Sequence, residues 1–525
     1  MAPSRRDALA QLGALLALPL VRWPRLATDP LTDTIAGFQA GRLRGEYTAE
    51  EVTRRARERC RERGTALRAV DLLADSALTE ATRSDGRLRR GGLRGPLDGV
   101  PLFAKSIYDM AGLPTTASSA EWARLFPGPV RRDALEVQRL REAGAVLLGK
   151  TAADDFAYRG NGTSSLTGQV LNPYDPSGVR TPGGSSAGAA VVVATGMAFA
   201  ALGTDDGGSN RIPAQFTGVV GMKPTFGLVP RTGVIPTWPY LDTHGPLART
   251  VADAALMLDA IAGPHASDGL AMRAPWPRGV LARLRDDALA GARLGLVALH
   301  VPRTQMAAES LTVFDRAIAD CVAAGAVVES FDAPVTRATV RAQFAEAAAA
   351  RGDVAPDPNS PAATANALQR YFAGQGGDAV AHVQRGIAAY RAFYDVLPSD
   401  WEAVAALLRR PYEQDAAGVS FARSRAETVA QLTNAFRAQR LDAMVYPTMP
   451  FPAPAATSSW PDVRTTLGYG NWLGLPEVSV PAGHGTDGMP AGNLSFVGLP
   501  GSDGQLLALA HDYERQSQRF VLPPG

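Results

Sequence analysis

Residues 181–211 read TPGGSSAGAAVVVATGMAFAALGTDDGGSNR, and this segment carries two Gly-Gly-Ser turns, ending at Ser185 and Ser209, on either side of a run of small residues. Paired glycines adopt positive φ angles and let successive backbone N–H groups point at one bound oxygen, as an oxyanion site requires. Residues 189–201 are apolar and mostly small, which predicts a buried helix passing into a short strand, with a break at Gly196. One such turn is usually structural, but the pair makes both serines candidates for chemistry.

The spacing of these turns resembles the signature region of the amidase signature family. In that family the second turn lies within the pattern G-T-D-x-G-G-S-x-R, and residues 203–211 here read GTDDGGSNR. The resemblance continues in GVVGMKPT at 218–225 and in GVPLFAK at 99–105, and it covers about residues 45–515. It implies an α/β fold in which residues 28–525 form a single large domain, with a central mixed β-sheet covered by helices on both sides.

The resemblance also implies a Ser-cisSer-Lys triad. Ser209 would be the nucleophile, Ser185 the proton relay after a cis peptide bond from Gly184, and Lys105 the base. The residues agree with this, because Lys105 follows an apolar run whose burial would lower the lysine pKa and keep the amine neutral. The remaining implied site residues are Asp206, Gly207 and Gly208, whose N–H groups with that of Ser209 would form the oxyanion hole, and the supporting residues Ser186, Asp205 and Arg211.

Three positions depart from the family pattern. The family has a small or apolar residue where Asp206 stands and an aliphatic residue at Asn210. A carboxylate at Asp206 would oppose an oxyanion unless it pointed away, although only backbone donors are required there. Glu477 replaces a small residue, and we expect that it could face the substrate and favour cationic amides.

The rest of the chain alternates helices and strands. Residues 133–149 and 310–328 each read as a helix, a glycine and an apolar strand, the αβ unit of a helix-covered sheet. Residues 230–246 are rich in Pro, Gly and Thr and predict a loop over the site. Residues 336–434 match the family least well and predict a helical insertion. Aromatic side chains that could line a pocket, or simply pack, are Trp238, Tyr240, Tyr371, Phe372 and Trp472.

Composition limits the partners. The 525 residues include 53 Lys+Arg and 51 Asp+Glu, a formal charge of +2, with no basic block that would follow a phosphate backbone. Nucleic acid is therefore not expected as a partner. The two cysteines and six histidines lack the spacing of a disulfide framework or a metal site, so we expect no metal and no cofactor. A small-molecule amide is the expected partner, and a homodimer is left open.

The N-terminal residues 1–27 resemble a twin-arginine export signal. Arg5 and Arg6 precede an apolar run of about 14 residues, shorter than the roughly 20 that span a bilayer, so no stable membrane anchor is expected. This predicts a periplasmic or secreted protein. The alternative is a cytoplasmic protein with an amphipathic N-terminal helix, since no Ala-x-Ala cleavage site follows.

The sequence thus predicts an amidase that hydrolyses a linear carboxylic amide to the acid and ammonia or an amine through an acyl-enzyme on Ser209. The glutamine-hydrolysing subunit of an amidotransferase and an inactive amidase-like binding protein are alternatives within the family. An α/β-hydrolase is a further alternative, because residues 184–188 fit G-x-S-x-G and His484 or His511 could complete its triad. No strand is predicted before that motif. A P-loop is excluded because neither glycine turn continues into Lys-Ser or Lys-Thr.

Overall fold

The fold is described from a computed structural model. It describes residues 29–272, 276, 279–298, 300–375, 384–386, 388, 411–457 and 468–524. The predicted export signal at 1–27 lies outside these residues. In the described part of the chain, none of the helices combines the length and apolar character needed to cross a bilayer.

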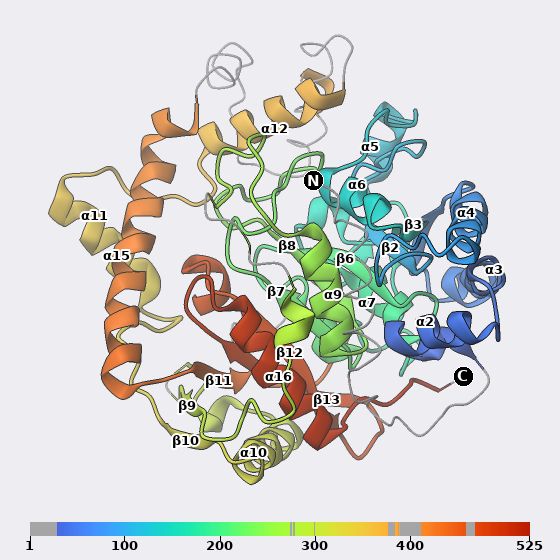
Figure 1. The fold of residues 1–525 in the computed structure, drawn as a ribbon. Coiled ribbons are helices and arrows are strands. Elements are labelled where there is room, and N and C mark those ends of the chain that lie inside the picture. Colours follow the sequence, from blue (N-terminus) through green and yellow to red (C-terminus); the bar gives the residue numbers. More distant parts are fainter. Residues whose placement is uncertain are drawn as a thin grey trace.

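One mixed sheet of eleven strands runs through the molecule (Figure 1). From one edge to the other its strands are β1 (Val70–Leu73), β3 (Val146–Thr151), β2 (Pro101–Lys105), β6 (Ala200–Asp205), β8 (Thr243–Ala248), β7 (Val220–Lys223), β12 (Glu477–His484), β13 (Pro490–Val497), β11 (Ala443–Pro447), β9 (Arg293–Leu296) and β10 (Val327–Ser330). Neighbours pair in parallel at β3/β2, β2/β6, β11/β9 and β9/β10, and antiparallel elsewhere. This confirms the predicted mixed α/β sheet.

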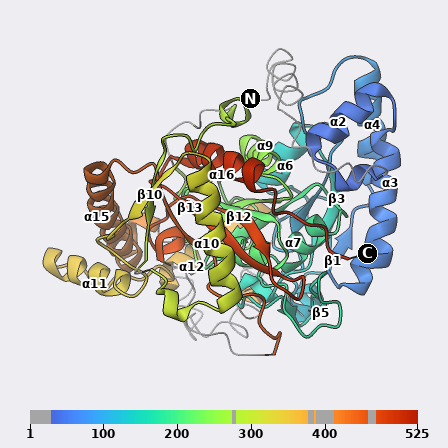
Figure 2. The same ribbon diagram turned by 90° about the horizontal axis from the view of Figure 1, so that it is seen from below.

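Helices cover both faces of the sheet. On one face α6 (Leu135–Glu142), α9 (Val251–Ile261), α16 (Asp503–Ser517) and α10 (Ala308–Ala323) contact one another in series, and Figure 2 shows the first three in one layer. The opposite face carries α7 (Ala187–Ala194) and α8 (Arg211–Phe216), which pack on the central strands. Because α7 and α8 follow the two Gly-Gly-Ser turns, both turns lie on this second face.

The predicted helix and strand between the turns are α7 and β6. Every residue of both is buried, and the chain turns between them at Gly196, whose φ is 66°. Small side chains let α7 lie close to its neighbours: a Cβ on Gly188 would stand 2.3 Å from the Ala69 carbonyl oxygen. The small-residue run therefore serves tight packing of the helix that presents Ser185.

The N-terminal helices α2 (Ile35–Arg44), α3 (Ala49–Arg59) and α4 (Ala77–Arg89) lie beside the β1 edge of the sheet (Figure 2). A capping box between Thr48 and Glu51 begins α3. The short elements α5 (Ala120–Leu125), β4 (Thr163–Ser164) and β5 (Gly168–Gln169) belong to connections near the same half of the sheet.

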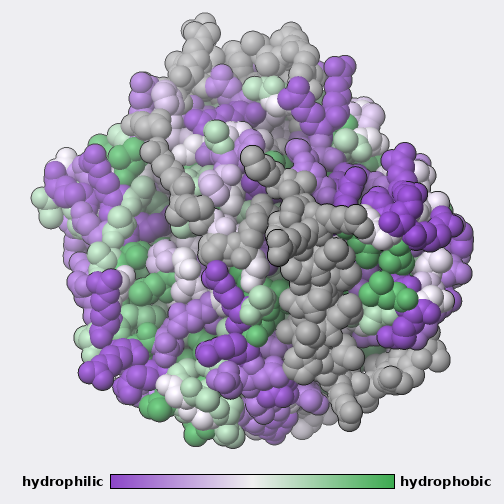
Figure 3. Space-filling model, viewed as in Figure 1, coloured by the Kyte–Doolittle hydropathy of each residue, from purple (hydrophilic) through white to green (hydrophobic). Residues whose placement is uncertain are grey.

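Helices also occupy much of 336–434. They are α11 (Val340–Arg351), α12 (Pro361–Gln375) and α15 (Ala416–Gln439). Phe344 of α11 and Phe421 of α15 pack with Trp472 in a cluster separate from the main core. That this stretch is an insertion stays a prediction. On the face drawn in Figure 3 hydrophilic residues predominate around the outer helices, and hydrophobic residues occur in small separate groups.

Candidate active site

Lys105 stands at the end of β2, where the parallel strand β6 also ends. Its Nζ lies 2.7 Å from Ser185 Oγ and 2.8 Å from Thr204 Oγ1. The side chain is fully buried, as expected from the apolar residues before it. Burial lowers the pKa of Lys105 to about 8, against the opposing effect of nearby carboxylates, chiefly Asp206. A lysine with this pKa can release its proton near neutral pH and act as a base.

Ser185 begins the turn into α7. The peptide bond between Gly184 and Ser185 is cis, as the resemblance implies. A side chain at Gly184 would collide with the Asp154 carboxyl, since a Cβ there would lie 2.5 Å from Oδ2. Ser185 is therefore held against Lys105 by a turn that has no room for a larger residue.

Ser209 lies at the wall of a small pocket. Its residue is 7% exposed, and its carbonyl accepts a hydrogen bond of 3.1 Å from the Ser186 N–H, which links the two glycine turns. The pocket has a volume of about 70 Å³, room for roughly five non-hydrogen atoms. It is lined by Ala157, Tyr158, Arg159, Gly160, Gly184, Asp206, Gly207, Ser209, Ile212, Thr237 and Trp238. A carboxamide group fits this space beside the serine.

The turn at 206–209 differs in one respect from the predicted oxyanion hole. The Gly208 N–H donates to Asp205 Oδ1 over 2.8 Å, so it braces the turn from inside, and Gly208 does not line the pocket. Asp206, Gly207 and Ser209 do line it. Their N–H groups remain the predicted donors, whereas the N–H of Gly208 is bonded to Asp205.

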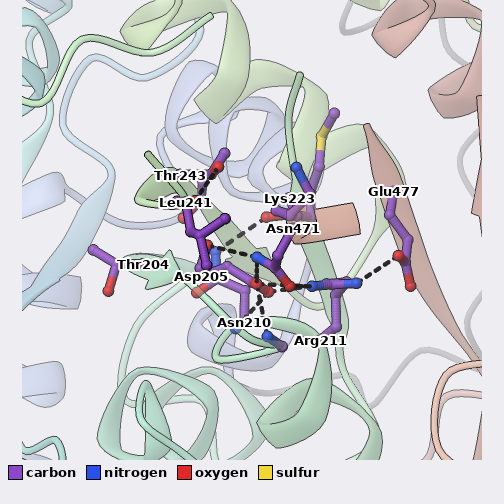
Figure 4. Close-up of polar contacts among 12 residues, drawn as sticks. Thr204, Asp205, Asn210, Arg211, Lys223, Leu241, Thr243, Asn471 and Glu477 are labelled. Atoms are coloured by element: carbon purple, nitrogen blue, oxygen red, sulfur yellow. Dashed lines mark hydrogen bonds and ion pairs between the residues drawn. The ribbon is translucent and has the colours of Figure 1, made fainter. Parts of the chain in front are cut away.

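A buried network of charges supports the turn (Figure 4). Asp205 Oδ1 and Oδ2 accept hydrogen bonds from Arg211 Nη2 (2.8 Å) and Nε (2.9 Å), and Figure 4 shows Arg211 between Asp205 and Glu477. Burial alone would raise the pKa of Asp205, but the Arg211 guanidinium and the amide of Asn471 hold it well below its ordinary value. The ion pair predicted between Asp205 and Arg211 is present.

Glu477 belongs to this network and not to the pocket. Its carboxylate accepts hydrogen bonds from Arg211 (2.5 Å), Tyr446 (2.7 Å) and Ser495 (2.6 Å), and the side chain is fully buried. The expectation that Glu477 faces the substrate is wrong. The residue lies on β12, whose pairing with β7 places it beside the guanidinium, a position that spacing along the chain does not reveal.

Asn210 and Ser186 fix the turn from the other side. Asn210 Nδ2 donates to the carbonyls of Met222 (3.0 Å) and Gly245 (3.2 Å). Ser186 Oγ donates to Asn210 Oδ1 (3.1 Å) and accepts from the Thr204 N–H (3.3 Å). These contacts account for a polar residue at Asn210 and fit the supporting position predicted for Ser186.

Sequence reasoning missed several residues of the site. Thr204, the second hydrogen-bond partner of Lys105, is part of the motif at 203–211, but the sequence alone indicated no role for it. Asp242, which belongs to the predicted loop, accepts hydrogen bonds from the N–H groups of Thr237 (3.2 Å) and Trp238 (2.9 Å) beside the pocket. That loop ends earlier than predicted, because β8 begins at Thr243.

Trp238 is the one aromatic candidate, among the described residues, that reaches the pocket wall. The others, Tyr240, Tyr371, Phe372 and Trp472, belong to hydrophobic clusters, which is the packing role that the sequence left open. A larger open depression of about 670 Å³ lies on α4 among Arg83, Arg87, Arg89, Arg90 and Arg94, and none of the described residues that line it is a Ser, Cys or His.

The α/β-hydrolase alternative does not fit the described residues. No strand leads into 184–188, and His511 lies 3.4 Å from Asp286 on the opposite face of the sheet, within α16. The His484 ring contacts the ring of Tyr174 in a tilted arrangement, with centroids 5.6 Å apart. Within the described ranges, no group of three or more His, Cys, Asp and Glu residues is arranged to hold a metal ion.

Comparison with known proteins identifies the family of this chain. The family model described as Amidase matches residues 51–507. The chain belongs to the amidase family. The A subunit of glutamyl-tRNA(Gln) amidotransferase from Symbiobacterium thermophilum is 34% identical over 505 residues, covering 92% of this chain and 96% of the relative. This amidase-family hydrolase thus has curated relatives along nearly its whole length.

Solved structures match this amidase-family chain as well. The native peptide amidase of Stenotrophomonas maltophilia is 33% identical, with a TM-score of 0.76 and coverage of 95% of this chain and 99% of that chain. The A subunit of glutamyl-tRNA(Gln) amidotransferase from Thermotoga maritima is 26% identical, with a TM-score of 0.59 and coverage of 82% and 87%. The predicted amidase signature fold is confirmed, and the roles of individual site residues stay predictions.

Proposed function

We propose that this protein hydrolyses a carboxylic amide through an acyl-enzyme on Ser209. The observation that carries the proposal is the 2.7 Å contact between Lys105 Nζ and Ser185 Oγ, next to the pocket that Ser209 lines. An amine that titrates near neutral pH, a buried relay hydroxyl and an accessible serine are the three groups that amide cleavage needs.

In the proposed reaction, protons pass among Lys105, Ser185 and Ser209. Neutral Lys105 accepts the proton of Ser185 while Ser185 accepts that of Ser209, and Ser209 Oγ attacks the amide carbonyl carbon. N–H donors of the turn at 206–209 hold the oxyanion. The lysine proton returns through Ser185 to the leaving nitrogen, the carbon–nitrogen bond breaks, and the acyl group remains on Ser209. Water then attacks the ester by the same relay and releases the acid.

Two contexts for this chemistry follow from the relatives. The first is a self-sufficient amidase acting on linear amides, supported by the match to peptide amidase along nearly the whole chain. The second is one component of an amidotransferase complex, supported by the curated relatives that carry that name. In the second context the substrate would be glutamine, and partner proteins would be needed for full activity.

Ammonia release by the purified chain tests the proposal. Wild type should release ammonia from simple amides or from glutamine, and Ser209→Ala should lose at least about 10³-fold. Ser177→Ala, on an exposed turn, is the matched control and should behave as wild type. Activity on several amides without a partner supports the first context, and activity on glutamine alone supports the second. Equal activity of Ser209→Ala and wild type would refute the acyl-enzyme.

A further inference from the structure

Asp206 is an unusual residue in the pocket wall. It lines the same pocket as Ser209, it is only 6% exposed, and among the described residues neither carboxyl oxygen has a hydrogen-bond donor. Buried polar atoms of this kind are normally satisfied, because leaving them without a partner costs free energy. The group that Asp206 meets at hydrogen-bond range is another acidic side chain, Asp242, so a proton or a cationic ligand must mediate their contact.

The side chain of Asp206 faces a second carboxyl group, that of Asp242. The two interact at hydrogen-bond range, which is attractive only when one of them carries a proton. Asp242 accepts hydrogen bonds from the N–H groups of Thr237 and Trp238. Burial and the neighbouring Asp242 raise the pKa of Asp206 well above its ordinary value. A cationic ligand group could therefore replace a proton in satisfying the two carboxyl groups.

Among the described residues, no side chain in the pocket wall offers that cation. Lys105 is committed to Ser185 and Thr204, and it must be neutral when it acts as a base. Arg159 also lines the pocket, but its side chain is exposed and it makes no hydrogen bond to either carboxyl oxygen of Asp206. A positive ligand group beside Ser209 could therefore interact with the Asp206 carboxyl in place of a proton.

We propose that Asp206 and Asp242 bind a primary ammonium group of the substrate, so that the enzyme prefers amides carrying an amine close to the scissile carbonyl. The inference rests on the proposed function. Asp206 and Ser209 line the same pocket of about 70 Å³, so short amides that carry the amine on the α or β carbon of the acyl group are the substrates to test. A bound ammonium donates hydrogen bonds to both carboxyls, and any proton that the two groups share passes to solvent. Asp206 then determines specificity.

Isosteric amides test this preference. Alaninamide and 2-methylpropanamide differ only in an ammonium for a methyl group, and so do β-alaninamide and butanamide. In wild type, kcat/KM for the cationic member of at least one pair should exceed that for the neutral member by about 10- to 100-fold. Asp206→Asn keeps the size and the backbone N–H, and should reduce this ratio to near one.

The control is Asp154→Asn. Asp154 is a buried carboxyl near Lys105 that does not line the pocket, so its loss changes the lysine environment equally for both members of a pair. Its ratio should match that of wild type even if both rates fall. A wild-type ratio near one, or an unchanged ratio in Asp206→Asn, would overturn the cation site.

Binding separates this inference from the proposed function. Calorimetry with propylammonium and with 1-propanol measures the site without hydrolysis. Propylammonium should bind wild type at least about tenfold more tightly than Asp206→Asn, and propanol should not distinguish them. Binding with this pattern in a protein that hydrolyses no amide would uphold the cation site and refute the proposed function. If propylammonium bound equally to wild type and to Asp206→Asn while wild type hydrolysed amides, the cation site would be refuted and the proposed function upheld.

Discussion

Changing Lys105 should alter the pH dependence of acylation. The pKa of Lys105 is lowered to about 8 by burial, so its neutral fraction rises from about 0.1 at pH 7 to about 0.9 at pH 9. If the neutral amine is the base, the wild-type acylation rate should climb about tenfold over this interval and then level off. Single-turnover release of p-nitroaniline from an acyl p-nitroanilide measures this rate directly.

Lys105→Ala removes the base and should lower the acylation rate by about 10²–10⁴-fold near neutral pH. Its remaining rate should follow hydroxide concentration without levelling off, so the deficit shrinks as the pH rises. Lys105→Arg should be no better than Ala, because a guanidinium does not lose its proton in this range. A wild-type rate that is flat from pH 7 to 9, or an inflection retained in Lys105→Ala, would refute the reasoning.

Three further predictions address the scaffold and the N-terminus. Glu477→Gln should destabilise the protein by about 3 kcal/mol in chemical denaturation, because it removes one partner of a buried ion pair. The variant should keep the wild-type preference between cationic and neutral amides, and a changed preference would contradict the structural role of Glu477. Gly188→Ala should lower stability by at least about 1–3 kcal/mol because its Cβ meets backbone, whereas Gly128→Ala, with open space around it, should have little effect; equal effects would contradict the close packing of α7. Replacing Arg5 and Arg6 by lysine should retain the protein in the cytoplasm of cell fractions, and an unchanged distribution would argue against export.

Local sequence patterns predicted most of the fold and the three candidate residues of the triad. The two glycine turns, the small residues between them and the apolar run before Lys105 are each continuous in sequence, so they identify α7, β6 and β2 without knowledge of the sheet order. Because β2 and β6 pair side by side in parallel, Lys105 comes within hydrogen-bond distance of Thr204, which is 99 positions away in the sequence. The motif contained Thr204, but its role appears only once the strands pair.

Long-range pairing also explains what the sequence left open. Asp206 and Asp242 meet because β6 pairs with β8, and Asp242 immediately precedes β8. Glu477 meets Arg211 because β12 lies beside β7. In both cases the sequence marked an unexpected carboxylate without locating its partner. The sequence therefore led us to expect Glu477 to face the substrate, whereas the carboxyl group in the pocket wall is that of Asp206.

The identity of the acylated residue tests the central proposal most directly. The protein is treated with a fluorophosphonate probe, digested, and the labelled peptide is mapped by mass spectrometry. We predict one adduct, on Ser209, that forms more slowly in Lys105→Ala and is absent in Ser209→Ala. An adduct on Ser185 or Ser186, or labelling that persists in Ser209→Ala, would contradict the account.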